Sequence, residues 1–316
     1  MIIKILKSLL RLSLGLFYRF NPFFRYTVAR SLTVFVFHEV TDKPSNFAEQ
    51  YGLTLKVHQF KDHIHWINSN FNVISPDVVS EDLPLPNNAA LITFDDGFSG
   101  AFLNAFPILE KLDIPVLMFM NMQSQIERSP MLSAKVLYLM DHSPCFKTYL
   151  RNLGITDAPH LRVTPKIMEE FDDQYGAPDQ DKINSYQGDL VDKETMELWD
   201  SSANVYYGNH FYDHWNAAAL SSHDLEEQFL LNKQALRKYR SSIDFFAFTN
   251  GKPHTCFSIE DVHQLEALGA RKIFSTVNGV NKDVGNALLG RVNTHATDEV
   301  SYHLWCRVGL SYSNFS

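Results

Sequence analysis

Residues Leu91–Gly97 read LITFDDG, an apolar stretch that ends in two adjacent carboxylates and a glycine. A short apolar run bounded by a turn residue is typical of a buried strand. Asp95 and Asp96 therefore stand where a buried strand ends, and neighbouring carboxylates in such a place repel each other and lose hydration. An isolated pair of this kind is more often a solvated turn, so its meaning depends on what else the chain brings to the same place.

From Thr33 onward, short apolar stretches alternate with segments of helical periodicity. Strands are expected over 33–38, 71–75, 90–94, 116–120, 204–207, 245–248, 272–277 and 287–292, and helices over 56–70, 101–112 and 258–268 and from about residue 221. Alternation of strands and helices indicates a parallel sheet, and six or seven such units favour a barrel over an open sheet. The sequence therefore predicts an α/β fold for residues 31–316.

Residues 124–190 interrupt this alternation. They are polar, with acidic pairs at 169–170 and 172–173, and they contain no recognisable strand–helix unit. We expect an insertion above the barrel mouth, partly helical around Ala134–Met140, because insertions at that face of a barrel usually shape access to the site.

Residues 1–30 form a segment of different character. They contain six basic residues and no acidic one, and basic side chains interrupt each apolar run before it reaches the length of a membrane span. This combination predicts an amphipathic helix in a membrane interface, with its basic residues at the lipid headgroups. The alternative is a helix that packs on the protein's own surface.

Charge and cysteine content limit the partners and the compartment. The chain has 316 residues and a formal charge of −8, so the part beyond the basic segment carries −14, which argues against nucleic acid as a partner. The three cysteines are widely spaced and odd in number, which indicates free thiols in a reducing compartment. We therefore expect a membrane-associated protein at the cytoplasmic face of the inner membrane, with the periplasmic side as the alternative.

A second stretch, GNHFYDHW at Gly208–Trp215, provides partners for the two carboxylates. His210 and His214 are four residues apart, so on a helical turn their imidazoles would face one way. Two histidines and one carboxylate are a common ligand set for a catalytic divalent metal. One carboxylate of the pair can bind the metal while the other addresses a water, and the cation offsets their repulsion. The joint occurrence of both stretches at predicted strand ends indicates a metal site.

These two stretches resemble the first two motifs of the polysaccharide deacetylases, the NodB-homology carbohydrate esterases. The first motif, T-F-D-D-G, is matched in full at Thr93–Gly97. The second, H-[ST]-x-x-H, is matched at His210 and His214, with Phe211 in place of the hydroxyl residue. The resemblance spans about residues 31–292 and implies a distorted (β/α)7-type barrel.

The resemblance also implies roles for the matched residues. Asp95 would be the general base, and Asp96, His210 and His214 would bind a divalent metal, usually zinc. The metal would polarise an acetyl carbonyl and activate water, and a backbone N–H near Gly251 would stabilise the oxyanion.

The later motifs of the family are matched less closely. The segment FAFTNGKP (residues 246–253) resembles the third motif, F-x-x-P-x-G, but has Thr249 where proline is expected and lacks the family's arginine. Arg291 in LLGRV is a candidate replacement for that arginine. The usual C-terminal Leu-x-His, which supplies the general acid, has only a poor counterpart in His295 of RVNTH.

Another candidate for the general acid lies upstream. VFVFHEV at residues 34–40 resembles the Y-H-x-V start of the biofilm poly-N-acetylglucosamine deacetylases, in which an N-terminal histidine takes this role. His38 would end the strand that precedes the Asp95 strand, so both would open on the same barrel face. The alternative is a structural histidine that caps a turn.

The function that follows from the resemblance is that of a metal-dependent hydrolase. It would remove an N-acetyl group from an amino sugar in a cell-envelope polysaccharide or in its lipid-linked precursor. One alternative is a non-catalytic carbohydrate-binding descendant, although a binding protein has no need for a base such as Asp95. Another alternative is an amidase on a non-sugar amide, with the insertion redirecting specificity.

Overall fold

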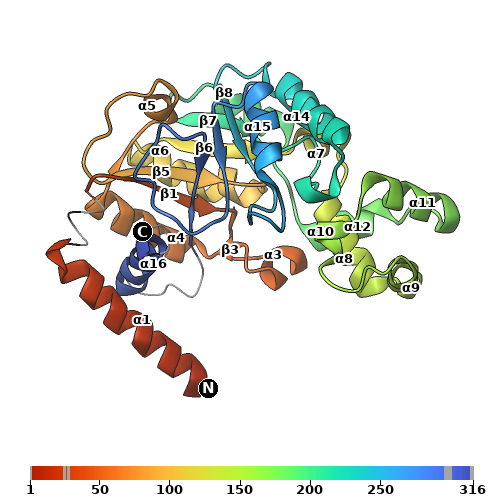
Figure 1. Cartoon of the computed structure of the whole chain (residues 1–316), viewed down its shortest axis with the longest axis horizontal. Coiled ribbons are helices and arrows are strands. Elements are labelled where there is room, and N and C mark those ends of the chain that lie inside the picture. The colour runs from red at the N-terminus through yellow and green to blue at the C-terminus, as the bar shows by residue number, and fades with distance from the viewer. Residues whose placement is uncertain (1, 24–25, 27–28, 295–300, 314–316) are drawn as a thin grey trace.

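The computed structural model describes residues 2–23, 26, 29–294 and 301–313. Its core is a curled sheet of nine parallel strands with helices around it (Figure 1). The strands are β1 (Leu32–Phe37), β4 (Asn72–Val73), β5 (Ala89–Phe94), β6 (Val116–Met120), β7 (Val205–Asn209), β8 (Ser242–Ala247), β9 (Lys272–Phe274), β10 (Leu288–Leu289) and β11 (Val292–Asn293). Their order is β10-β9-β8-β7-β6-β5-β1-β11, with β4 beside β5.

The central strands are buried on both faces. Every residue of β1, β5 and β6 is buried, because helices cover the outer face of the curled sheet and side chains from the other strands fill its inner face. β1 and β5 run in register along their whole length, from the pair Leu32 and Ala89 to the pair Phe37 and Phe94. This register places the residues that follow Phe37 and Phe94 side by side at the same edge of the sheet.

The two edge strands of the sheet are close in sequence. Only Gly290 and Arg291 separate β10 from β11, so the chain passes from one edge of the sheet to the other within two residues. A sheet whose edges approach in this way is curled into a partly closed barrel. The predicted α/β barrel is therefore confirmed, and its distortion lies in this interrupted closure.

Helices on the outside of the sheet follow the predicted pattern. α4 (Val57–Asn70), α14 (Ser222–Leu236) and α15 (Ile259–Ala267) agree with expectation, and serine caps begin α14 and α15. The helix predicted over 101–112 begins as a π-helical turn, η1 (Ala101–Ala105), and continues as α6 (Phe106–Lys111). Short elements complete this part: β2 (Glu39–Val40), α3 (Asn46–Gln50), β3 (Thr54–Leu55), α5 (Pro76–Ser80) and the 3-10 turn η2 (Ala217–Ala219).

The segment between β6 and β7 contains more helix than the sequence predicted. Its helices are α7 (Met122–Glu127), α8 (Leu132–His142), α9 (Pro144–Asn152), α10 (Pro159–Arg162), α11 (Pro165–Tyr175), α12 (Gln180–Gln187) and α13 (Lys193–Trp199). The predicted helix around Ala134–Met140 is present as α8. Polar N-caps begin several of the others, at Ser143, Thr164 and Asp179, and such local signals do not depend on an apolar stripe. α9 and α11 project to one side of the barrel (Figure 1).

The two ends of the described chain meet on the other side of the molecule. α1 (Ile2–Phe20) packs against α16 (Ser301–Ser313), and α16 in turn lies on α4 (Figure 1). An edge-to-face contact of 5.4 Å between the rings of Trp66 and Trp305 joins α4 to α16. Within the described residues, none of the helices has the length and apolar character that a membrane crossing requires.

Candidate active site

The site is built from the residues that directly follow neighbouring parallel strands. His38 follows β1, Asp95 and Asp96 follow β5, His210 follows β7, and Asn121 follows β6. The carboxyl ends of parallel strands meet at one edge of the sheet, so segments far apart in sequence place their side chains together. The strand-end positions inferred from the sequence for His38, Asp95, Asp96 and His210 agree with the structure.

Asp96, His210 and His214 form a compact buried cluster. One potential ligand atom from each residue lies within 4.8 Å of the others. The Nε2 atoms of His210 and His214 are 3.3 and 3.2 Å from Oδ1 of Asp96. Oδ1 of Asp96 and Nε2 of His210 are nevertheless buried without a hydrogen-bond partner. Buried polar atoms are normally satisfied, so this unsatisfied set fits a divalent cation among them, as the donor types also do.

The ring of His210 is held by the backbone of β8. Its Nδ1 atom is 2.7 Å from the carbonyl oxygen of Ala247. This contact fixes Nδ1 as the protonated nitrogen and leaves the lone pair of Nε2 directed at Asp96, which is the arrangement that metal-binding histidines commonly show.

The prediction that His210 and His214 share a helical turn is wrong. Residues 210–216 form an irregular loop, in which Phe211 has a φ of 61°. This left-handed conformation is rare for a bulky residue and needs local support. The amide of Asn121 supplies part of it by donating to the carbonyls of His210 and Phe211, and Oδ1 of Asn209 accepts from the backbone N–H of Phe211.

Asp95 is held by Arg291, which lies in the two-residue link between β10 and β11. Nη1 and Nη2 donate to Oδ1 and Oδ2 at 2.7 and 2.8 Å, and Nε donates to the carbonyl of Ser275 at 3.1 Å. Arg291 has no exposed surface and Asp95 is 3% exposed. Arg291, the candidate replacement for the family's arginine, therefore lies directly against Asp95.

His38 borders the same carboxylate. Its Nε2 atom is 4.0 Å from Oδ2 of Asp95, and its side chain keeps 24% of its surface exposed. His38 is therefore reachable by a substrate at the barrel mouth. The other candidate acid, His295, lies outside the described residues.

Charge interactions set the protonation of the cluster. Burial by itself would raise the pKa of Asp96, but the adjacent His214 and His210 hold that pKa well below its usual range. Burial would also raise the pKa of Asp95, yet Arg291 and His210 lower it. Burial alone lowers the pKa of His214, and the Asp96 carboxylate raises it above the ordinary histidine value. Both carboxylates are therefore ionised at neutral pH, as a metal site requires.

Several supporting residues escaped the sequence analysis. Asn232 of α14 donates to the carbonyl of Met120 and to Oδ1 of Asn209, both at 2.8 Å, and so joins the ends of β6 and β7. Asn121 is equally important for the His210 loop. A polar residue directly after an apolar strand is a signal that could have identified Asn121, whereas nothing local marks Asn232.

The insertion reaches the cluster of Asp96, His210 and His214 through Asp213. Oδ1 of this buried residue accepts the backbone N–H of Leu132, the first residue of α8, and the N–H of His214, at 2.9 and 2.7 Å. In addition, the amide of Asn216 donates to the carbonyl of Leu161 in α10 at 2.7 Å. His160, also in α10, lies near enough to His214 for the two charges to interact. The insertion therefore borders the site.

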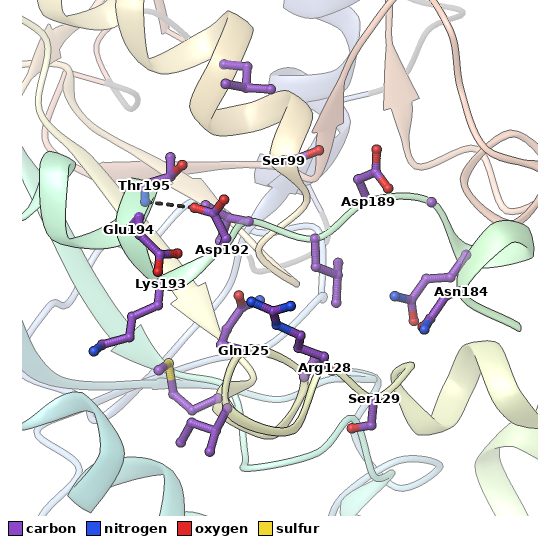
Figure 2. A pocket seen from close by; sticks show the side chains of 18 of the residues that line it. Ser99, Gln125, Arg128, Ser129, Asn184, Asp189, Asp192, Lys193, Glu194 and Thr195 are labelled. Atoms are coloured by element: carbon purple, nitrogen blue, oxygen red, sulfur yellow. Dashed lines mark hydrogen bonds between the residues drawn. The ribbon is translucent and has the colours of Figure 1, made fainter. Parts of the chain in front are cut away.

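A cavity of about 1050 Å³ lies between α7 and the segment at residues 184–195 (Figure 2). Ser99, Gln125, Arg128, Asp189 and Asp192 are among its lining residues, and the cluster residues Asp96, His210 and His214 are not. The segment at residues 188–191 lines this cavity and is bound to the chain that follows Asp96, because the backbone N–H of Ser99 donates to the carbonyl of Asp189 and that of Val191 donates to the carbonyl of Gly97. This cavity therefore does not contain the metal cluster.

Comparisons with known proteins agree with this geometry. Residues 82–267 match the family model described as Polysaccharide deacetylase. The fold resembles IcaB from Ammonifex degensii, with a TM-score of 0.59, 16% identity, and coverage of 88% of this chain and 97% of that one. It also resembles the Streptococcus pyogenes deacetylase PplD, in a complex with acetate, with a TM-score of 0.56, 12% identity, and coverage of 85% and 96%. The BpsB deacetylase domain from Bordetella bronchiseptica gives a TM-score of 0.51 at 16% identity, with coverage of 84% and 96%. No curated protein matches the sequence.

Proposed function

Because the chain belongs to the polysaccharide deacetylase family, we propose that it removes an N-acetyl group from an amino sugar with the help of a divalent metal. Membership of this family identifies the chain as a carbohydrate N-deacetylase, a hydrolase that acts on a carbon–nitrogen bond. An enzyme is therefore favoured over the alternative of a non-catalytic carbohydrate-binding protein. The metal, the individual roles of the residues and the substrate are the proposed parts.

The strongest support for the proposal is the geometry of the Asp96, His210 and His214 side chains. Asp96, His210 and His214 offer three ligand atoms within 4.8 Å of one another, and the second carboxylate, Asp95, lies beside them. Three protein ligands with room for further ligands are typical of catalytic zinc sites, so zinc is the proposed ion. A bound divalent ion would supply Lewis acidity at the acetyl carbonyl.

Asp95 has the position and the protonation state of a general base. Arg291 fixes the plane of its carboxylate through two hydrogen bonds and keeps it ionised. A lowered pKa makes the carboxylate a weaker base, but it ensures that the base form is fully populated at neutral pH. Asp95 then accepts a proton from the attacking water.

His38 is the proposed proton donor to the leaving amine. It is partly exposed, it lies 4.0 Å from Asp95, and it follows a strand that opens at the same edge of the sheet. Burial lowers the pKa of His38, although the nearby Asp96 and Asp95 carboxylates oppose that change. A lower pKa makes the imidazolium a stronger acid but leaves less of it protonated at neutral pH, so the protonated form depends on the Asp96 and Asp95 carboxylates that oppose the shift.

The proposed substrate is an N-acetylated sugar in a cell-envelope polysaccharide or in its lipid-linked precursor. The basic, acid-free segment 1–30 supports the lipid-linked version, since an enzyme at a membrane surface meets such substrates directly. The proposed location is the cytoplasmic face of the inner membrane, with the periplasmic side as the alternative.

Mass spectrometry of envelope glycans and lipid-linked sugars from cells with and without the gene would test the substrate class. We expect one glycan or lipid-linked sugar to carry an extra acetyl group in cells that lack the gene. Purified protein should also be offered simple non-sugar amides. Hydrolysis of such amides, together with glycans that are unchanged in cells without the gene, would contradict the proposal. It would favour the alternative of an amidase that acts on a non-sugar amide.

A further inference from the structure

The first helix displays its apolar face to solvent. Six large apolar side chains of α1 are between 39% and 66% exposed: Leu6, Leu9, Leu10, Leu16, Phe17 and Phe20. At 100° per residue these positions fall on one side of the helix. A helix whose purpose was to cover the protein core would turn this side inward, because apolar burial is the main source of stability for a surface helix.

The opposite side of α1 is the one that packs against the protein. Gly15 is buried, and the hydroxyl of Ser8 lies 3.4 Å from Nε2 of His303 in α16. Gly309 of α16 lies directly beneath the ring of Tyr18, where an added Cβ atom would come within 2.2 Å of a ring carbon. The helices therefore approach closely through small and polar residues, and this contact leaves the apolar side of α1 uncovered. The alternative of a helix that packs on the protein's own surface therefore describes one side of α1, and the exposed apolar side needs a separate explanation.

Charge indicates what covers the apolar side. Residues 1–30 carry six basic side chains and no acidic one. Among the basic side chains of α1, Lys7 is exposed beside the apolar side and Arg19 is exposed near its end. A second copy of this helix would bring an equal positive charge against the first, and the two would repel each other. An anionic lipid surface instead offers apolar depth for the leucines and phenylalanines and negative headgroups for the bases.

We propose that the exposed apolar side of α1 docks into the headgroup boundary of an anionic membrane while the opposite side stays bound to α16. Because α16 lies on α4 and on β11, the catalytic barrel is held against the membrane by packed helices and does not hang from a flexible tether. Removing α1 altogether would uncover α16, so point substitutions on the exposed side are the cleaner test.

The experiment is co-sedimentation with vesicles of phosphatidylcholine and phosphatidylglycerol, with pure phosphatidylcholine vesicles for comparison. The test variant is Leu10→Ser/Phe17→Ser/Phe20→Ser. The matched control is Leu153→Ser/Leu198→Ser/Ile259→Ser, which removes three comparably exposed apolar side chains elsewhere on the surface. Unfolding temperature and acetate release from a soluble substrate should be the same in both variants and the unaltered protein.

We expect the unaltered protein and the control to bind the anionic vesicles, and the test variant to lose at least about tenfold in partitioning, since three apolar anchors are absent. High salt should weaken binding of the unaltered protein only in part. Unaltered protein that stays in solution, or a test variant that binds as well as the control, would overturn the proposal. The unaltered protein could instead form a dimer in the absence of lipid and fail to bind vesicles, while the test variant stays monomeric. That result would overturn the proposal and would show that a second copy of the chain covers the apolar side of α1.

Discussion

Arg291 and Asp95 form a buried, two-pronged ion pair across 196 residues of sequence, with hydrogen bonds of 2.7 and 2.8 Å. The pair joins the two-residue link between the edge strands to the centre of the sheet, because Arg291 lies between β10 and β11 while Asp95 follows the central strand β5. It therefore links the closure of the barrel to the protonation state of the proposed base.

Replacing Arg291 by Met should affect both stability and pH dependence. Removing one partner of a buried ion pair typically costs about 3–5 kcal/mol in the free energy of unfolding. Without Arg291, burial would raise the pKa of Asp95, so activity should begin to fall at a higher pH as the solution is acidified. Denaturant unfolding and a pH profile of kcat/KM would measure the two effects. Arg271→Met, at an exposed position, is the control, and an unshifted acid limb in Arg291→Met would contradict the proposed link.

Asp95→Asn should keep the metal and lose turnover. The amide preserves the shape of the side chain but cannot accept a proton, and loss of a general base typically costs about 10²–10⁴ in rate. Metal content and kcat measured on the same preparation would separate the two properties. If the variant loses its metal together with its activity, the roles of Asp95 and Asp96 are the reverse of those proposed.

His210→Ala should lose both the metal and activity, because it removes one of three ligands from a buried site. His223→Ala, an exposed histidine at the start of α14, should change neither property. Metal analysis after addition of zinc and dialysis would show the difference. Full retention of zinc by His210→Ala would show that this cluster does not hold the ion.

Metal affinity should fall with decreasing pH. The Asp96 carboxylate raises the pKa of His214, although burial opposes the shift, so a proton competes with the metal for this side chain more strongly than at an ordinary histidine. Metal binding is therefore strongest above the raised pKa of His214, and it weakens as the pH falls through that pKa. Calorimetric titration with zinc in buffers of different ionisation enthalpy, between about pH 6 and 8, should detect the released proton. Binding without proton release would contradict this account of His214.

His38→Gln should lose activity selectively, with metal and fold retained. Hydrolysis of an N-acetyl sugar needs protonation of a poor leaving amine, whereas an aryl acetate has a good leaving group and should be partly spared. Kinetics of both substrates with His38→Gln and with His295→Gln would identify the acid. A selective loss in His295→Gln alone would assign the acid role to the C-terminal side.

Strand-end positions were the part of the site that the sequence predicted well. Asp95, Asp96 and His210 each follow an apolar run, and parallel strands bring such positions together whatever the details of the connections. The conformation of the His210–His214 loop was predicted wrongly, because a spacing of four residues does not distinguish a helical turn from a loop. The positive φ of Phe211 is supported by Asn121, a residue that follows a different strand.

The path of the insertion could not be predicted from the sequence either. Its contact with the site depends on Asp213, whose carboxylate binds the first turn of α8 and the backbone of His214 together. No local pattern indicates such a partner. The outward orientation of the apolar side of α1 likewise depends on tertiary structure, since it follows from the packing of Gly15 and Tyr18 against α16.

The most direct test is acetate release from N-acetylated amino-sugar oligomers by purified protein, before chelation, after chelation, and after reloading with one equivalent of zinc. The account predicts equal amounts of acetate and free amine from the reloaded protein, and almost none from chelated protein or from zinc-loaded Asp95→Asn. Undiminished release after complete removal of the metal, or no release from any N-acetylated sugar by the zinc-loaded protein, would contradict a metal-dependent N-deacetylase.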